Sequence, residues 1–161
     1  MKTLFMETTK IEPSQTVSEI QKILGKYGAS AIMIEYQNGE VSAVSFEIKV
    51  NAQHLPFRLP CRWEAIFKIL RRRVEEKNHW PDYLEKKEPE WKIQAKRIAW
   101  RQILRWIEAQ LALVETGMVK IQEVFMPYIQ VGIDETFYDR LEATKFKMVE
   151  YKGAKEKDVS H

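Results

Sequence analysis

The stretch ASAIMIEYQNGEVSAVSFEIKV, residues 29–50, decides the fold of this 161-residue chain. Two runs rich in Ile, Val, Phe and Tyr lie on either side of the dipeptide Asn38-Gly39. Side chains of these types are enriched in β-strands, and Asn-Gly is the strongest short-range signal for a two-residue turn, because both residues accept a positive φ. The sequence therefore predicts an antiparallel hairpin.

The register counted from this turn pairs Tyr36 with Val41 and predicts two faces. One face carries Ala31, Met33, Val44, Phe46 and Ile48. The other carries Ile32, Ile34, Tyr36, Val41 and Ala43. Both faces are partly apolar, whereas a sheet with one face in water alternates cleanly, so the second face needs a later helix, a partner subunit or a ligand to cover it. We expect a homodimer whose interface is formed by Ile32, Ile34, Tyr36 and Val41, unless the long helix described below folds over them.

The residues before the hairpin predict a helix. Apolar residues recur at helical spacing in residues 13–28. Thr16 and Glu19 stand three apart, which is the spacing of a capping box at a helix start. Gly28 predicts the end of the helix, because glycine adopts the left-handed conformation without steric cost.

The residues after the hairpin predict a third strand and a second helix. Residues 54–60 read as a strand, and Pro56 places it at a sheet edge because proline has no N–H to donate. Residues 61–76 read as a helix with one apolar side. That side carries Trp63, Ile66, Phe67, Leu70 and Val74. Residues 78–90 contain two prolines and mixed charge, which indicates a linker with at most a short helical turn.

The second half of the chain reads as helical. Residues 90–116 predict a long amphipathic helix that stops at Gly117. Its apolar side holds Trp91, Ile98, Ile103, Trp106, Ile107, Leu111 and Val114. A short helix is then expected to end or kink at Pro127, and Asp134 is expected to cap a final helix.

These elements predict an α+β fold: a helix, a three-stranded antiparallel sheet, a helix, and a helical C-terminal half. We expect residues 1–78 to form an α-β-β-β-α core. Residues 79–150 would form a helical extension packed on it within one compact domain. Residues 151–161 are polar and are expected to form a flexible tail.

Composition bounds the class of protein. The chain is 45% hydrophobic and 30% charged, which is typical of a globular domain. Its single cysteine, Cys61, excludes an internal disulfide and fits a reducing compartment. The N-terminus lacks the apolar core of a signal peptide, and no apolar run approaches the ~20 residues of a membrane span. We therefore expect a cytoplasmic protein.

Charge is unevenly distributed along the chain. Residues 57–105 contain 14 Lys and Arg and 7 Asp and Glu, so this segment carries +7 and the remainder −4 of the total of +3. Such asymmetry indicates a polyanionic partner.

Three consecutive arginines, Arg71, Arg72 and Arg73, lie on the second predicted helix. Because an α-helix turns 100° per residue, Arg72 points away from the apolar side and the other two lie to either side of it. Such a fan is typical of a solvated face with arginines that cover the core edge, and phosphate contact is the alternative.

Four further cations lie along one side of the long helix. They are Lys96, Arg97, Arg101 and Arg105. Like charges at this spacing cost about a few tenths of a kcal/mol per pair, so the stripe indicates acidic neighbours or an anionic partner. Glu90, Glu108 and Glu115 lie on the same broad face and are candidate neighbours.

The five tryptophans lie in or beside this basic segment, where aromatic faces interleaved with arginine suit stacking on unpaired bases. Trp63, Trp91 and Trp106 belong to apolar stripes and are expected in the core. Trp80 lies in the linker and Trp100 near the edge of its stripe, so these two are the candidates for exposed stacking.

Signals for catalysis and cofactors are weak. The three histidines are scattered, no Cys/His set has zinc spacing, and there is no P-loop or dinucleotide fingerprint. Cys61 follows His54 by seven residues, and a buried structural thiol is favoured over a nucleophile–base pair. We therefore predict a non-enzyme without a metal or cofactor.

Two blocks of the chain resemble a family of small hypothetical proteins encoded by bacteriophages and prophages. They are LPFRLPCRWEAIFKIL, residues 55–70, and WIEAQLALVETGMVKIQEVFMPYI, residues 106–129. The hairpin before them is similar in layout, and the resemblance covers most of the chain except the tail. It implies a phage setting, in the cytoplasm of the host cell, and it brings no catalytic motif.

Together these observations predict a phage-encoded, non-enzymatic nucleic-acid-binding accessory protein. Its candidate contacts to nucleic acid or another anion are Arg71, Arg72, Arg73, Lys96, Arg97, Arg101, Arg105, Trp80 and Trp100. The alternative is a phage inhibitor that binds a host defence protein or sequesters a signalling nucleotide.

Overall fold

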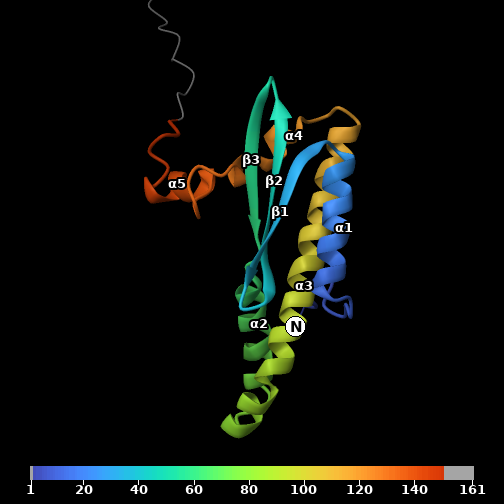
Figure 1. Ribbon diagram of the computed structural model, residues 1–161. Coiled ribbons are helices and arrows are strands. Elements are labelled where there is room, and N and C mark those ends of the chain that lie inside the picture. The colour runs from blue at the N-terminus through green and yellow to red at the C-terminus, as the bar shows by residue number, and fades with distance from the viewer. Residues whose placement is uncertain (1, 151–161) are drawn as a thin grey trace, which may run out of the picture.

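A helix and a three-stranded sheet are followed by a predominantly helical second half, as expected for an α+β chain (Figure 1). The computed structural model describes residues 2–150. Its elements are α1 (Pro13–Lys26), β1 (Ala29–Gln37), β2 (Glu40–Val50), β3 (Gln53–Pro60), α2 (Trp63–Glu75), α3 (Pro81–Glu115), α4 (Ile121–Phe125), the 3₁₀ helix η1 (Met126–Tyr128) and α5 (Phe137–Ala143). The tail expected at residues 151–161 lies outside the described residues.

The sheet is antiparallel with the order β1-β2-β3. Asn38 and Gly39 have φ values of 53° and 78°, so the predicted two-residue turn is confirmed. Pro56 lies in the edge strand β3, and its carbonyl accepts a hydrogen bond of 2.8 Å from the backbone N–H of Gln130. The backbone nitrogen of Pro56 lies on the same outer edge, so its lack of an N–H removes no hydrogen bond between β2 and β3.

The predicted register is wrong for the pairs from Glu35 to Ala31. Tyr36 pairs with Val41 as expected, but Glu35 pairs with Ala43, so Ser42 is an extra residue on β2. This β-bulge shifts the following pairs by one residue, up to a second irregularity between Ala31 and Ala29, and over that stretch it exchanges the faces of one strand relative to the other.

The bulge removes the second apolar face. Ile32 lies opposite Phe46 and Ile34 opposite Val44, so all four side chains share the inner face of the sheet. Ile32, Ile34 and Val41 pack against the core within one chain, and only Tyr36 of the expected dimer interface is exposed, at 67%. The assignment of these four residues to one open face was therefore wrong.

The outer face of the sheet is polar where an apolar surface was expected. The guanidinium of Arg58 donates two hydrogen bonds to the carboxylate of Glu35, from Nε to Oε1 at 2.9 Å and from Nη2 to Oε2 at 2.8 Å. The hydroxyl of Ser45 donates a third, of 2.8 Å. These bonds lower the pKa of Glu35, with the hydrogen bond from Arg58 as the largest cause.

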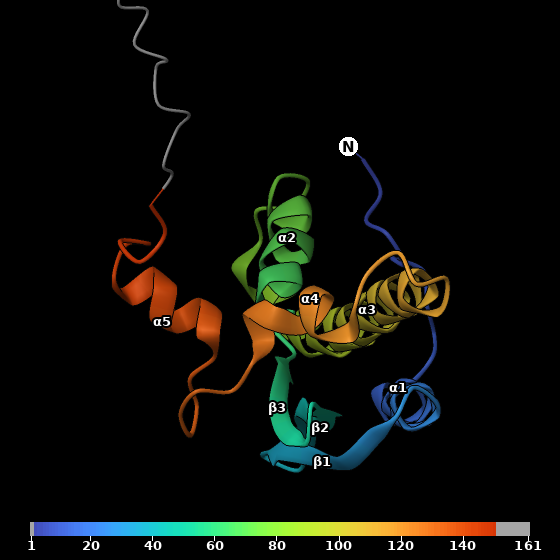
Figure 2. The ribbon, with the colours of Figure 1, turned by 90° about the horizontal axis from the view of Figure 1, so that it is seen from above.

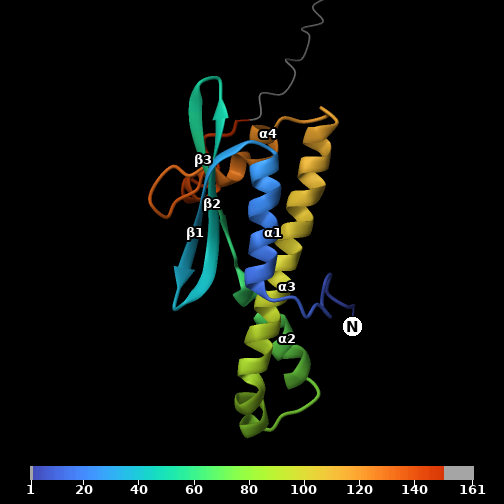
Figure 3. The same ribbon diagram turned by 45° about the vertical axis from the view of Figure 1, so that its right-hand side comes forward.

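The inner face is covered by α1 and α3, which lie side by side against it (Figures 2 and 3). The core combines residues from both sides of position 78, from Val17 in α1 to Phe125 in α4. The largest fully buried side chains are Thr16, Ile20, Leu24, Val44, Phe57, Ile98, Trp100, Leu104, Ile107, Leu111 and Phe125. The N-terminal half of the chain thus depends on α3 for its core.

Helix α3 begins nine residues earlier than expected, at Pro81, so the predicted linker is wrong over most of its length. Pro81 occupies the start of the helix, where a missing N–H costs nothing. Pro89 removes one internal bond, and the packing of α2 along this part of α3 stabilises the helix in spite of it. Together α2, residues 76–80 and the first part of α3 form a helical hairpin that projects beyond the sheet (Figures 1 and 3). We call residues 62–97 the arm.

Neither of the two helix caps expected from the sequence is formed in the structure. Helix α1 begins at Pro13, so Thr16 and Glu19 lie inside it and form no capping box. Helix α5 is capped by Thr136, not by Asp134, and Thr136 and Asp139 form a complete capping box. Along residues 2–150, no helix has the length and apolar character needed to cross a bilayer.

Candidate functional site

The predicted basic stripe on α3 is divided among acidic residues from other parts of the chain. Lys96 forms an ion pair with Glu40 of β2, and Arg97 forms one with Glu12 just before α1. Since these acidic residues are remote in sequence, the fold itself brings them to the stripe.

Arg101 is buried, although it was expected to face a ligand. Its Nη1 donates to Glu19 Oε2 at 2.7 Å and to Thr16 Oγ1 at 3.4 Å, and its side chain is only 6% exposed. The two residues that suggested a capping box therefore hold this guanidinium. One turn further on, Arg105 pairs with Glu108 at 2.7 Å on the surface.

The three arginines of α2 diverge, as the helical geometry predicted. Arg71 pairs with Glu75 at 2.8 Å, and Arg73 pairs with Glu7 of the N-terminal segment at 2.6 Å. Within residues 2–150, Arg72 has no ion-pair partner.

The pairing weakens the case for a phosphate-binding face. Six of the seven candidate cations have an acidic partner, and they point to different neighbours instead of one concave surface. A phosphate that bound one of these cations would displace its carboxylate and leave that carboxylate unpaired. Binding would therefore neutralise few phosphates in net terms and release few counterions from a nucleic acid.

The tryptophans separate into core and surface. Trp100 is 1% exposed, so its expected role in base stacking is wrong. Trp106 packs edge-on against Phe125 and Tyr128, with ring centroids 5.4 Å apart in both pairs. Trp80, by contrast, is 76% exposed at the end of the arm.

Within residues 2–150, the fold does not bring together His54 and Cys61 or a set of metal ligands. Burial is the main cause that raises the pKa of the Cys61 thiol to about 12. His54 and Cys61 are separated by the length of β3, roughly 20 Å of extended chain, and His54 Nδ1 lies 3.5 Å from Glu47. No group of three or more potential metal ligands occurs in the part of the chain that the structure describes.

A hollow of about 510 Å³ opens between the hairpin tip and the start of α2. Its walls carry three cations, Arg58, Arg62 and Lys96, and two carboxylates, Glu40 and Glu64. Arg58 is already held by Glu35, and Lys96 by Glu40 and the face of Trp63, whose ring centroid lies 4.6 Å from Nζ. Arg62 lies 3.9 Å from Asp139, so each of the three cations already has an acidic neighbour and the hollow offers little unpaired positive charge to a nucleotide.

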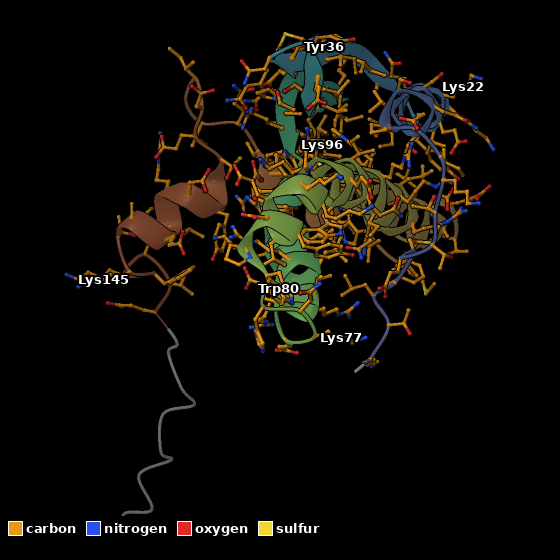
Figure 4. All side chains as sticks on the ribbon, turned by 90° about the horizontal axis from the view of Figure 1, so that it is seen from below. Lys22, Tyr36, Lys77, Trp80, Lys96 and Lys145 are labelled. Carbon is orange, nitrogen blue, oxygen red and sulfur yellow. The ribbon has the colours of Figure 1, made fainter. Side chains whose placement is uncertain are left out.

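The arm leaves apolar side chains without full cover. Five apolar residues lie along one side of α2. Within the part of the chain that the structure describes, none of the residues of this helix is fully buried. Leu84 and Trp91 of α3 are likewise only half-buried, and Tyr83 is exposed beside Trp80. Figure 4, which looks from the end of the arm, labels Trp80 and Lys77 there, far from Tyr36 on the hairpin.

The two halves of the arm differ in charge. The tip half, residues 69–90, contains six basic and six acidic residues and has no net charge. The root half, residues 62–68 and 91–97, contains five basic residues and one acidic residue, and carries +4. The most exposed aromatic side chains of the arm are therefore surrounded by balanced charge.

Comparisons of the chain with protein-family models, curated proteins and solved structures found no match.

Proposed function

We propose that this chain is a non-catalytic interaction protein that binds another protein through its arm. The observation that carries the proposal is the incomplete burial of α2. A helix with a continuous apolar side normally buries that side against a core. In the arm, α2 packs against α3 and, through Arg73, against the N-terminal segment, and these contacts leave its apolar side chains only half-buried.

The end of the arm has the composition of a binding surface. Trp80 and Tyr83 are large, exposed and one turn apart at the start of α3, and Trp and Tyr are among the residue types most enriched at positions that dominate binding energy. Both positions belong to helical or capping backbone, since Trp80 is the N-cap of α3. Such anchors lose little conformational freedom on binding.

Charge favours a protein over a nucleic acid as the partner. The tip half of the arm has no net charge, whereas a surface that binds a polyanion carries an excess of Lys and Arg. The proposal therefore keeps the protein-binding part of the inhibitor role expected from the sequence.

Site-specific photocrosslinking tests the proposal. A photoreactive amino acid replaces Trp80 in one variant and Met118 in another, since both residues are exposed and apolar but Met118 lies beyond the other end of α3. We expect a discrete crosslinked protein product from position 80 and none from position 118. Equal crosslinking at both positions, or none at either, would overturn the proposal.

A second candidate is single-stranded nucleic acid bound at the same end of the arm. One observation favours it: Arg72, without an ion pair among the described residues, lies on the same arm as the exposed Trp80. Binding through phosphates should weaken steeply between about 50 and 200 mM salt. An oligonucleotide titration of the wild type and of Arg72→Gln, with Lys22→Gln as the control, decides the matter. Failure to bind at low salt would exclude this candidate.

A further inference from the structure

We propose that the protein bound by the arm is a second copy of this chain, and that two arms pack antiparallel as a four-helix bundle. This inference rests on the proposed function and names its partner. It replaces the dimer surface expected on the hairpin, whose residues Ile32, Ile34 and Val41 pack inside a single chain.

The shape of the arm suits self-association. A helical hairpin with a half-buried seam is one half of a four-helix bundle, in which each pair of helices supplies the cover that the other lacks. A two-fold axis uses the same surface on both copies, so one apolar seam is sufficient for both sides. Phe67, Leu70 and Val74 of α2 and Leu84 of α3, all half-buried, would form the layers between the two hairpins.

Charge selects the antiparallel arrangement. Two arms side by side in the same direction would bring together the two copies of Lys68 and of Lys92, the root cations that no carboxylate from outside the arm pairs with in residues 2–150. The antiparallel arrangement sets the neutral tip half of one arm against the root half of the other. Glu85 and Glu90 would then approach the root half of the opposite copy. There Lys92 pairs with Glu88 of its own helix, so an acidic residue of the second copy can approach it as well.

The area of the arm is sufficient for a specific but modest interface. Helix α2 has 13 residues, so the arm face is roughly 20 Å long and, with two helices side by side, roughly 20 Å wide. Two such faces remove on the order of 1,000 Å² from water, close to the lower limit of specific protein interfaces. We therefore expect a dimer that dissociates on dilution.

Light scattering over a dilution series tests the dimer. At a concentration on the order of 100 µM we expect the wild type to approach twice the chain mass of 19.1 kDa, as for a low-area interface. Trp80→Glu and Tyr83→Glu change exposed residues, so they leave the fold intact and should weaken the dimer at least about tenfold. Met118→Glu and Ile133→Glu are matched controls, since they introduce the same charge at exposed apolar positions outside the arm. Circular dichroism checks that all four variants are folded.

The outcomes distinguish this inference from the proposed function. A wild-type monomer at all concentrations would overturn the dimer, whereas crosslinking of a different protein at position 80 would still support binding through the arm. A dimer that only Met118→Glu or Ile133→Glu dissociates would overturn the arm as the interface. A dimer that is lost specifically in Trp80→Glu and Tyr83→Glu supports the inference, and crosslinking at position 80 should then yield the chain joined to itself.

Discussion

Arg101 of α3 is held by Glu19 of α1 through a 2.7 Å hydrogen bond from Nη1 to Oε2, with the Arg101 side chain 6% exposed and that of Glu19 37% exposed. Thr16, one turn before Glu19, accepts from the same nitrogen and is fully buried. The ion pair joins the two helices that cover the sheet. A guanidinium in this position is costly to leave alone, so the pair fixes how α1 lies on α3.

Removal of one partner of this pair should be strongly destabilising. We expect Glu19→Ala to lower the free energy of unfolding by about 2–4 kcal/mol, because it leaves Arg101 buried without a counter-charge. Glu108→Ala, which breaks the surface pair with Arg105, should change it by at most about 1 kcal/mol. Urea unfolding followed by circular dichroism measures both values.

A double variant separates the charge from the packing. Glu19→Leu with Arg101→Met replaces the pair by apolar side chains and should recover much of the stability lost in Glu19→Ala. Equal losses in Glu19→Ala and Glu108→Ala would contradict the buried position of Arg101.

The pair of Glu35 and Arg58 predicts a specific dependence on pH. The hydrogen bonds from Arg58 lower the pKa of Glu35 in the folded chain. The unfolded chain therefore binds a proton at this carboxyl more readily than the folded chain does. Its stabilising contribution is present above the ordinary carboxyl pKa of about 4.3 and is lost as the pH falls through the lower value of the folded chain.

Melting temperatures of the wild type and of Glu35→Gln test this dependence. The variant should be less stable at pH 7, and the difference should shrink as the pH falls below about 4. Glu108→Gln, at an exposed pair, serves as the control and should follow the wild type closely. A constant difference between Glu35→Gln and the wild type down to pH 2.5 would refute the assignment.

Local signals predicted the framework of the fold. The Asn38-Gly39 turn, the edge position of Pro56 and the helix stops at Gly28 and Gly117 each follow from a backbone requirement of one or two residues. Such requirements act within a few residues, so the sequence displays them directly. The order of helices and strands follows from them.

The bulge at Ser42 was not predictable in the same way. A bulge places few demands on residue type, and serine gives no signal for one. Its effect is nevertheless large, because a shift of one residue moved Ile32 and Ile34 to the inner face and removed the basis of the expected dimer surface. The helical state of residues 81–89 was missed because it depends on the packing of α2.

The partners of the basic residues were missed because they are distant in sequence. Glu7, Glu12, Glu19 and Glu40 all precede residue 41, whereas the cations that they neutralise lie between residues 73 and 101. One signal was available: the chain outside the basic segment carries −4. That opposite charge is as compatible with internal pairing as with an external polyanion, and the structure shows internal pairing.

Exposure of the tryptophans gives a direct test of their placement. Trp80→Phe should remove the tryptophan emission that acrylamide quenches most strongly, because Trp80 is the most exposed of the five. The free energy of unfolding of Trp80→Phe should differ from that of the wild type by at most about 0.5 kcal/mol. Trp100→Ala should instead cost about 3–5 kcal/mol, since it empties a fully buried site next to the ion pair of Arg101.

The single thiol should behave as a buried structural group. Burial raises the pKa of Cys61 to about 12, so at pH 8 only on the order of one molecule in 10⁴ carries the reactive thiolate. We expect an aromatic disulfide reagent to modify folded protein slowly, at a rate that rises sharply once urea unfolds the chain. A Cys61→Ala background with Ala112→Cys, at an exposed position of α3, should react at least about a hundredfold faster without urea. Rapid modification of Cys61 in the native protein would show that the junction of β3 and α2 opens to solvent, and would contradict its place in the core.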